Sequence, residues 1–155
     1  MKKLFMILIA LVALFVSAPA ANAAEWYTVC SDNGETIALD PDITTSDNGA
    51  SYLVWVRNSF DIPESRDFYT RDRGYSETVF YKLTLYKFTD NWRIFNIVQV
   101  SVYGENNKLI EQYDNPDMAS TASIVPDVSP DGSIPPIVAI AEAAKVIYEI
   151  RTNPE

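Results

Sequence analysis

The chain has 155 residues, with 21 acidic and 12 basic side chains, no histidine and a formal net charge of −9 at pH 7. This acidic balance argues against nucleic acids and anionic membrane surfaces as partners, because both require a basic binding face. The missing histidine excludes Ser-His-Asp and Cys-His catalysis and removes a common zinc ligand. We therefore expect that the protein is not an enzyme and that it holds no cofactor and no metal.

The first residues are typical of export through the Sec pathway. Lys2 and Lys3 precede an uninterrupted apolar run, 4–16, and a small-x-small site ends at Ala23. This order of basic, apolar and small residues predicts a signal peptide over 1–23. The apolar run is shorter than a membrane span, which requires about 20 apolar residues. We expect a single domain over 24–155 that is periplasmic, secreted or surface-associated, with no stable membrane insertion after cleavage.

Cys30 is the only cysteine of the chain. No intrachain disulfide is therefore expected, and no cysteine follows the apolar run directly to carry a lipid anchor. Within a predicted strand, we expect Cys30 to be a small buried side chain rather than a reactive thiol. A disulfide-linked dimer is the alternative.

Three strands are predicted in the first part of the domain, over 26–30, 36–40 and 50–58. The tetrapeptide Ser-Asp-Asn-Gly occurs at both 31–34 and 46–49, before the second and third of these strands. Asn-Gly between apolar runs favours a tight turn, because both residues accept positive φ. A calcium loop is the alternative, but neither copy has the alternating acids and the closing glutamate of that motif. We predict two turns with the same backbone geometry.

The polar segment 59–75 holds the candidate binding residues. Arginine and tyrosine are enriched at the energetically important positions of protein interfaces. Long connections are also often functional. The candidate protein-binding residues are Arg66, Phe68, Tyr69, Arg71, Arg73 and Tyr75. The alternative is a solvated loop without a partner, because four acidic residues balance the arginines.

The segment 76–103 predicts a long antiparallel hairpin with its turn at Asp90-Asn91. β-branched and aromatic residues alternate there with a period of two. Strict alternation places Phe80, Tyr86, Phe95 and Ile97 on the face opposite the inner valines.

A short edge strand over 108–113 and a long loop over 114–133 follow the hairpin. The segment 137–150 predicts the one clear helix, with Ser133 as a candidate cap and an apolar face that must be buried. The predicted fold class is α+β, an antiparallel sheet of five or six strands with one C-terminal helix packed on a face. A single helix leaves the other face aromatic, so that face is a candidate dimer or ligand interface unless the loops cover it.

Asp40 and Asp42 are the one pair of carboxylates that suggests catalysis, since two carboxylates serve as acid and base in glycoside hydrolysis. The alternative is that Asp40 ends a strand and Asp42 begins a turn beside Pro41. We favour the alternative because no activated nucleophile accompanies the pair.

The order of these features resembles the bacterial surface-adhesin protein E family. The matching features are Trp26-Tyr27, Leu39-Asp40, Asn48-Gly49 before Val54-Trp55-Val56, the long hairpin and the proline-rich approach to the helix. The resemblance covers nearly all of 24–155. It implies an exported, non-enzymatic module that binds host matrix or envelope proteins. The alternative function is a periplasmic structural or envelope-maintenance domain that acts as a homodimer through the uncovered face.

Overall fold

The structure is a computed structural model, and it describes residues 25–114, 122–124 and 134–153. The predicted signal peptide and the predicted cap Ser133 lie outside these residues. The strands are β1 (Tyr27–Asp32), β2 (Glu35–Leu39), β3 (Thr44–Ser46), β4 (Ser51–Phe60), β5 (Tyr81–Thr89), β6 (Ile94–Tyr103), β7 (Leu109–Asp114) and β8 (Ala122–Ser123). The helices are α2 (Pro63–Asp72) and α3 (Pro136–Thr152), with 3-10 turns η1 (Asp47–Gly49) and η2 (Glu105–Asn107).

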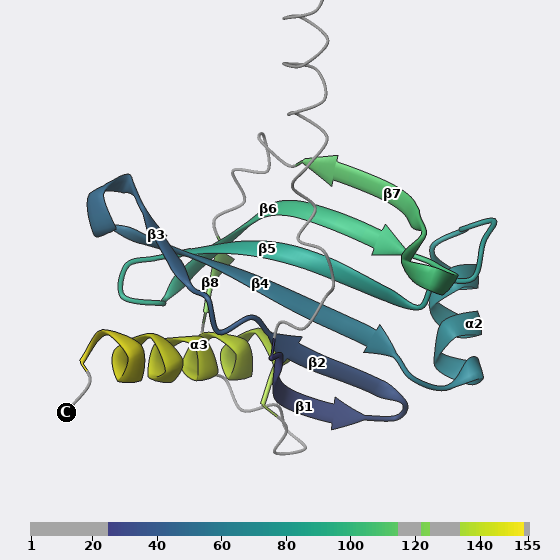
Figure 1. The fold of residues 1–155 in the computed structure, drawn as a ribbon, viewed down its shortest axis with the longest axis horizontal. Coiled ribbons are helices and arrows are strands. Elements are labelled where there is room, and N and C mark those ends of the chain that lie inside the picture. Colours follow the sequence, from purple (N-terminus) through teal and green to yellow (C-terminus); the bar gives the residue numbers. More distant parts are fainter. Residues whose placement is uncertain (1–24, 115–121, 125–133, 154–155) are drawn as a thin grey trace, which may run out of the picture.

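The strands form one antiparallel sheet, shown in Figure 1, and this confirms the predicted α+β class. Six strands follow the order β1-β2-β4-β5-β6-β7, so β7 is an edge strand as predicted. Two short strands extend the sheet at its margins, β3 beside β4 and β8 beside β6. The sequence predicts connections, not strands, for both of these segments. Strands of two or three residues carry too little periodicity to be detected.

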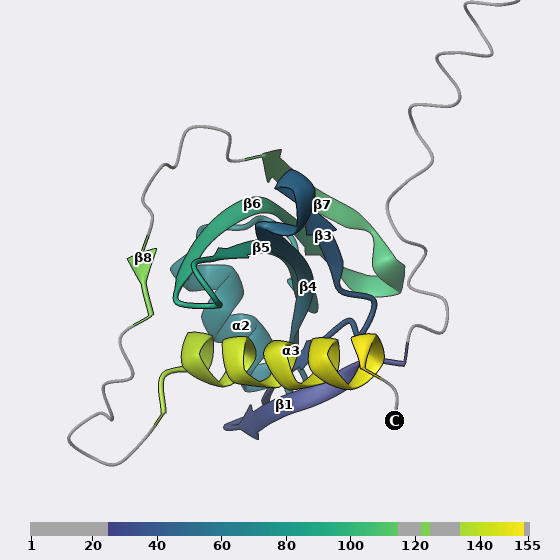
Figure 2. The same cartoon turned by 90° about the vertical axis from the view of Figure 1, so that its left-hand side faces the viewer.

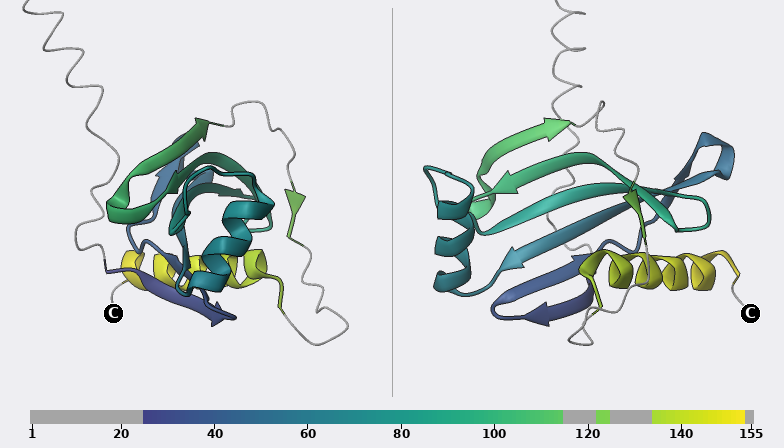
Figure 3. Two further views of the ribbon diagram at one scale, coloured as in Figure 1. Left: turned by 90° about the vertical axis from the view of Figure 1, so that its right-hand side faces the viewer. Right: turned by 180° about the vertical axis from the view of Figure 1, so that it is seen from behind.

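The sheet is strongly curved, and the two helices lie at opposite ends of its concave side (Figures 2 and 3). At the α3 end, Ile140, Ala141 and Ala144 are buried with Leu39 and Phe88. The alanines let the helix axis approach the strands closely, so the predicted C-terminal helix is confirmed together with its buried face. No helix within the described residues is long and apolar enough to cross a membrane.

Both Asn-Gly turns have the predicted backbone geometry. Asn33 and Gly34 have φ of 49° and 76°, and Asn48 and Gly49 have φ of 58° and 86°. The central hairpin also turns at the predicted place. There Trp92 has φ of 71°, a conformation that costs a bulky residue about 1–2 kcal/mol. Burial of the indole and its stacking on Tyr52, with 4.2 Å between ring centroids, hold it in place.

A β-bulge corrects the predicted face of the aromatic residues in the hairpin. Leu85 pairs with Gln99 and Tyr86 pairs with Ile97, so Val98 is an extra residue in β6. A bulge inverts the alternation beyond it. Phe95 therefore packs into the same cluster as Val54, and Ile97 packs with Val100. Tyr86 of β5 pairs directly with Val54 of β4, so these two side chains lie on the same face without any effect of the bulge. The prediction that Phe80, Tyr86, Phe95 and Ile97 oppose the inner valines was therefore wrong for the last three, whereas Phe80 packs in the separate cluster of Tyr81 and Leu83.

The helix α2 corrects the prediction that 59–75 is a loop and that the C-terminal helix is the one clear helix. Pro63 stands in the first turn together with Glu64, which suits the positive end of the helix dipole. The inward face consists of Ser65, Arg66, Tyr69 and Thr70 rather than aliphatic side chains. The apolar stripe that identifies a helix in a sequence is therefore missing.

The convex face of the sheet exposes less aromatic surface than predicted. Tyr81, Leu83 and Tyr103 are buried there, and Trp26 and Trp55 pack against them. Tyr81 and Tyr103 stack with ring centroids 4.7 Å apart. Most of the aromatic surface expected to remain on this side is therefore taken up by contacts within the domain.

We predict that the hydrophobic core between the concave face of the sheet and α3 contributes much of the stability of the domain. Phe88 is fully buried, whereas Phe68 is 61% exposed on α2. Phe88→Ala is expected to lower the free energy of unfolding by about 3–5 kcal/mol, because it leaves a cavity among aromatic rings. Phe68→Ala, the matched control, is expected to change it by less than about 0.5 kcal/mol. Urea unfolding of both variants measures the difference, and similar losses would contradict the packing described here.

Candidate functional site

Polar contacts with the end of β4 fix α2 in place. The Arg66 guanidinium donates from Nε to the Phe60 carbonyl at 2.7 Å and from Nη2 to the Asp61 carbonyl at 3.0 Å. The same group lies 4.2 Å from the centroid of the Phe80 ring. Arg66, predicted to bind a partner, is therefore an anchor of the helix.

Two hydroxyl groups complete the attachment of α2. Ser65 donates to the carbonyl of Gly34 at 2.9 Å, which connects the helix to the β1–β2 turn. Thr70 accepts the backbone N–H of Val79 at 2.9 Å, just before β5. The helix is thus held by hydrogen bonds at three points, one of them to the distant β1–β2 turn and two to the residues that flank the helix in sequence.

The six predicted binding residues do not form a single patch. Tyr69 and Tyr75 turn inward, and their rings are 6.3 Å apart. Phe68 and Arg71 lie one turn apart on the outward, exposed side of α2. Arg73 stands at the boundary, 3.6 Å from Asp72 and 5.9 Å from the Tyr69 ring centroid.

A cavity of about 390 Å³ lies between the inward side of α2 and the sheet. We call it the concave-face cavity. Its lining combines tyrosine rings, three charged side chains and an apolar floor. The lining residues are Tyr69, Arg73, Tyr75, Lys82, Thr84, Tyr86, Ile97, Val100, Glu111 and Tyr113. Three of the six predicted residues, Tyr69, Arg73 and Tyr75, thus belong to it.

Lys82 is the cation inside this cavity. No carboxylate of the described residues lies within 4.0 Å of its Nζ atom, which is 5.4 Å from the Tyr69 ring centroid. Burial lowers the pKa of Lys82, and the nearby Arg73 lowers it further, while Glu35 of β2 acts in the opposite direction. Lys82 of β5 pairs with Asn58 of β4 and with Val102 of β6, which places its side chain on the concave face. The sequence alone did not single out this residue.

The hydroxyl groups of three tyrosines, Tyr69, Tyr75 and Tyr86, belong to the lining of the cavity. The Tyr75 hydroxyl hydrogen-bonds to the Glu111 carboxylate of β7, and burial together with this bond raises the pKa of Tyr75. Burial also raises the pKa of Tyr69 and of Tyr86. These hydroxyls therefore stay protonated near neutral pH and act as hydrogen-bond donors or acceptors rather than as bases.

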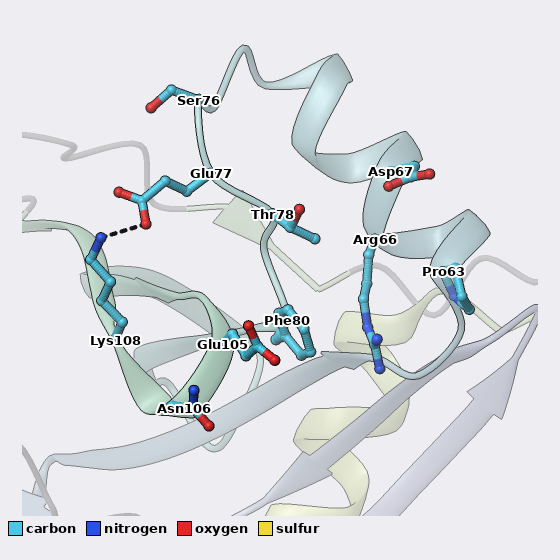
Figure 4. A pocket seen from close by; sticks show the side chains of 10 residues that line it. All are labelled: Pro63, Arg66, Asp67, Ser76, Glu77, Thr78, Phe80, Glu105, Asn106 and Lys108. Carbon is cyan, nitrogen blue, oxygen red and sulfur yellow. Dashed lines mark hydrogen bonds and ion pairs between the residues drawn. The ribbon is translucent and has the colours of Figure 1, made fainter.

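A larger hollow of about 650 Å³ lies on the other side of α2, between the helix, the segment before β5 and η2 (Figure 4). Its two cations, Lys108 and Arg66, already have partners within the protein. Lys108 is 2.6 Å from Glu77, and Arg66 is bonded to backbone carbonyls. We therefore regard the concave-face cavity as the better candidate site, although it is smaller.

The carboxylates considered for catalysis connect elements of the fold. The Asp40 carboxylate accepts the backbone N–H of Asp42 at 2.8 Å, which forms a turn around Pro41. Arg151 at the end of α3 donates to Asp42 at 2.5 Å and to the Pro41 carbonyl at 2.7 Å. The pair thus links α3 to the β2–β3 connection.

The remaining chemically reactive groups give no second site. Cys30 is half-buried in β1 and has no disulfide partner. Burial, followed by the negative charge of Asp32, raises the pKa of the thiol, so it is a weak nucleophile at neutral pH. Within the described residues, no group of three or more cysteine, aspartate or glutamate side chains is arranged to hold a metal ion.

Comparison of the chain with protein-family models, with curated proteins and with solved structures gives no match. The resemblance to the surface-adhesin protein E family stays a prediction. The function is therefore argued below from the residues of this chain.

We predict that Lys82 lowers the stability of the domain at neutral pH. Its pKa is lower in the folded than in the unfolded chain, so the unfolded chain binds more protons between these two values and stability rises with pH across that window. Lys82→Met is expected to stabilise the domain at pH 7. Its advantage, which is the amount by which its free energy of unfolding exceeds that of the native protein, should shrink toward pH 10. The tyrosines that titrate in this range are present in both proteins. Urea unfolding at several pH values measures the advantage, with Lys145→Met on α3 as the control. An advantage that grows with pH would contradict the prediction.

Arg66 and Arg71 are two arginines of one helix with different surroundings. Arg66→Lys removes the paired donors to Phe60 and Asp61 and is expected to lower the free energy of unfolding by about 1–3 kcal/mol. Arg71→Lys is expected to have little effect, since Arg71 is exposed. Urea unfolding and amide hydrogen exchange within α2 measure both, and equal effects would contradict the anchoring role of Arg66.

Proposed function

We propose that the protein is an exported, non-enzymatic binding module whose partner is a protein, contacted through the outward side of α2. The observation that carries this proposal is Phe68, a large aromatic side chain that is 61% exposed next to Arg71. Aromatic residues and arginine dominate the energetics of protein interfaces. The predicted signal peptide and the resemblance to surface adhesins support the exported setting and the class of partner.

The attachment of α2 also suits a binding role. The contacts of Ser65, Arg66 and Thr70 fix the helix from its inward side. A partner that binds the outward side meets a helix that is already ordered, so association costs less conformational entropy. Neighbouring acidic residues, Glu64 and Asp67, are exposed on the same helix and favour a partner with basic groups near the contact.

A homodimer through the sheet face has less support. The aromatic side chains on the convex face are largely buried among themselves, and Tyr86, Phe95 and Ile97 pack on the concave side. An exposed apolar pair does lie on α3, where Val146 is 50% and Ile150 is 68% exposed. This pair provides a matched control surface for the test below.

Binding of purified 24–155 to immobilised host matrix proteins, at low and at physiological salt, tests the proposal. Phe68→Ala is expected to weaken saturable binding about tenfold, and Arg71→Ala to weaken it by a smaller factor. Ile150→Ala replaces an equally exposed apolar residue on α3 and is expected to leave binding unchanged. Binding that is absent, or that depends on Ile150 and not on Phe68, would refute the proposal.

A further inference from the structure

We propose that the concave-face cavity binds a small molecule that combines an aromatic ring with a single carboxylate. This site is separate from the outward side of α2, because Phe68 and Arg71 do not line the cavity. The inference therefore goes beyond the proposed contact with a protein and does not depend on it.

The walls and floor of the cavity suit a flat aromatic ring. Tyr69 and Tyr75 face it from α2 and the segment that follows, while Tyr86 and Tyr113 face it from β5 and β7. Ile97 and Val100 supply an apolar floor. A volume of about 390 Å³ is within the range of small-ligand pockets, and aromatic rings pack favourably on one another by stacking or edge contact.

Lys82 supplies the charge that a carboxylate requires. Its side chain is half-buried on the concave face, and none of the described carboxylates is close enough to form an ion pair with it. A partly buried cation without a paired carboxylate is unfavourable, and a bound anion relieves this by a charge-assisted hydrogen bond. Arg73, an exposed residue of the cavity lining, adds a second positive charge.

Two carboxylates limit how much negative charge the cavity accepts. Glu111 lines it, and Glu35 is close enough to act on the charge of Lys82. A group with two negative charges, such as a phosphate monoester, meets this repulsion more strongly than a carboxylate does. The Tyr75 hydroxyl is engaged with Glu111, so the open cation at Lys82 remains the one strong anchor among these groups.

Titration of the isotope-labelled protein, residues 24–155, with four probes tests this site by NMR. The probes are 3-phenylpropionate, benzyl alcohol, propionate and phenyl phosphate. We expect saturable shifts with 3-phenylpropionate at the amides of β5, β6 and α2, and at least tenfold weaker binding of the other three. Equal binding of benzyl alcohol or propionate, or tighter binding of phenyl phosphate, would overturn the proposed ligand class, and no binding of any probe would overturn the site.

Variants test the role of the cation separately from the fold. Lys82→Met keeps the length of the side chain and removes the charge, so we expect it to weaken the binding of 3-phenylpropionate at least tenfold. Lys145→Met, on α3 and outside the cavity, is expected to bind as the native protein does. Thermal unfolding of Lys82→Met establishes that it folds. Unchanged affinity in a folded Lys82→Met protein would overturn the assignment, whatever the protein-binding experiment shows.

Discussion

The pairing of β5 with β6 is the constraint on which the rest of the structure depends. One extra residue in β6, Val98, lets Phe95 and Ile97 lie on the same face as Val100. Without this bulge, regular alternation would divide the ring side chains of the hairpin between two faces. Bulges also increase the local twist, in keeping with the curvature of the sheet (Figure 2). One face therefore becomes concave and rich in apolar side chains, and both helices lie at its ends.

The two helices cover this face by different means. The helix α3 uses small and aliphatic residues, Ile140, Ala141 and Ala144, and its last turn is joined to the β2–β3 connection through Arg151 and Asp42. The helix α2 uses polar anchors instead. Such anchors fix a helix at discrete points and do not fill the volume beneath it, so the concave-face cavity remains under α2 with Lys82 inside it.

The two sides of α2 consequently have different chemistry, and both proposals follow from this separation. Phe68 and Arg71 face outward on a helix that is already ordered, which favours contact with a macromolecule. Tyr69 and Tyr75 face a volume of small-molecule size next to a cation that has no counter-ion. The short sequence that suggested one patch contains two surfaces, because residues one position apart on a helix point about 100° apart.

The sequence by itself determined the features that depend on neighbouring residues. The Asn-Gly turns, the two strands of the central hairpin and the C-terminal helix follow from local backbone preferences and from regular periodicity, and so does the α+β class. Only the tertiary structure decided the faces of Phe95 and Ile97, since a bulge is defined by the partner strand. It also decided that 63–72 is helical, because Ser65, Arg66 and Thr70 gain their partners from Gly34, Phe60 and Val79. Lys82 resembles any strand lysine in the sequence, and its burial arises from α2 and β7, which the chain brings to it from either side.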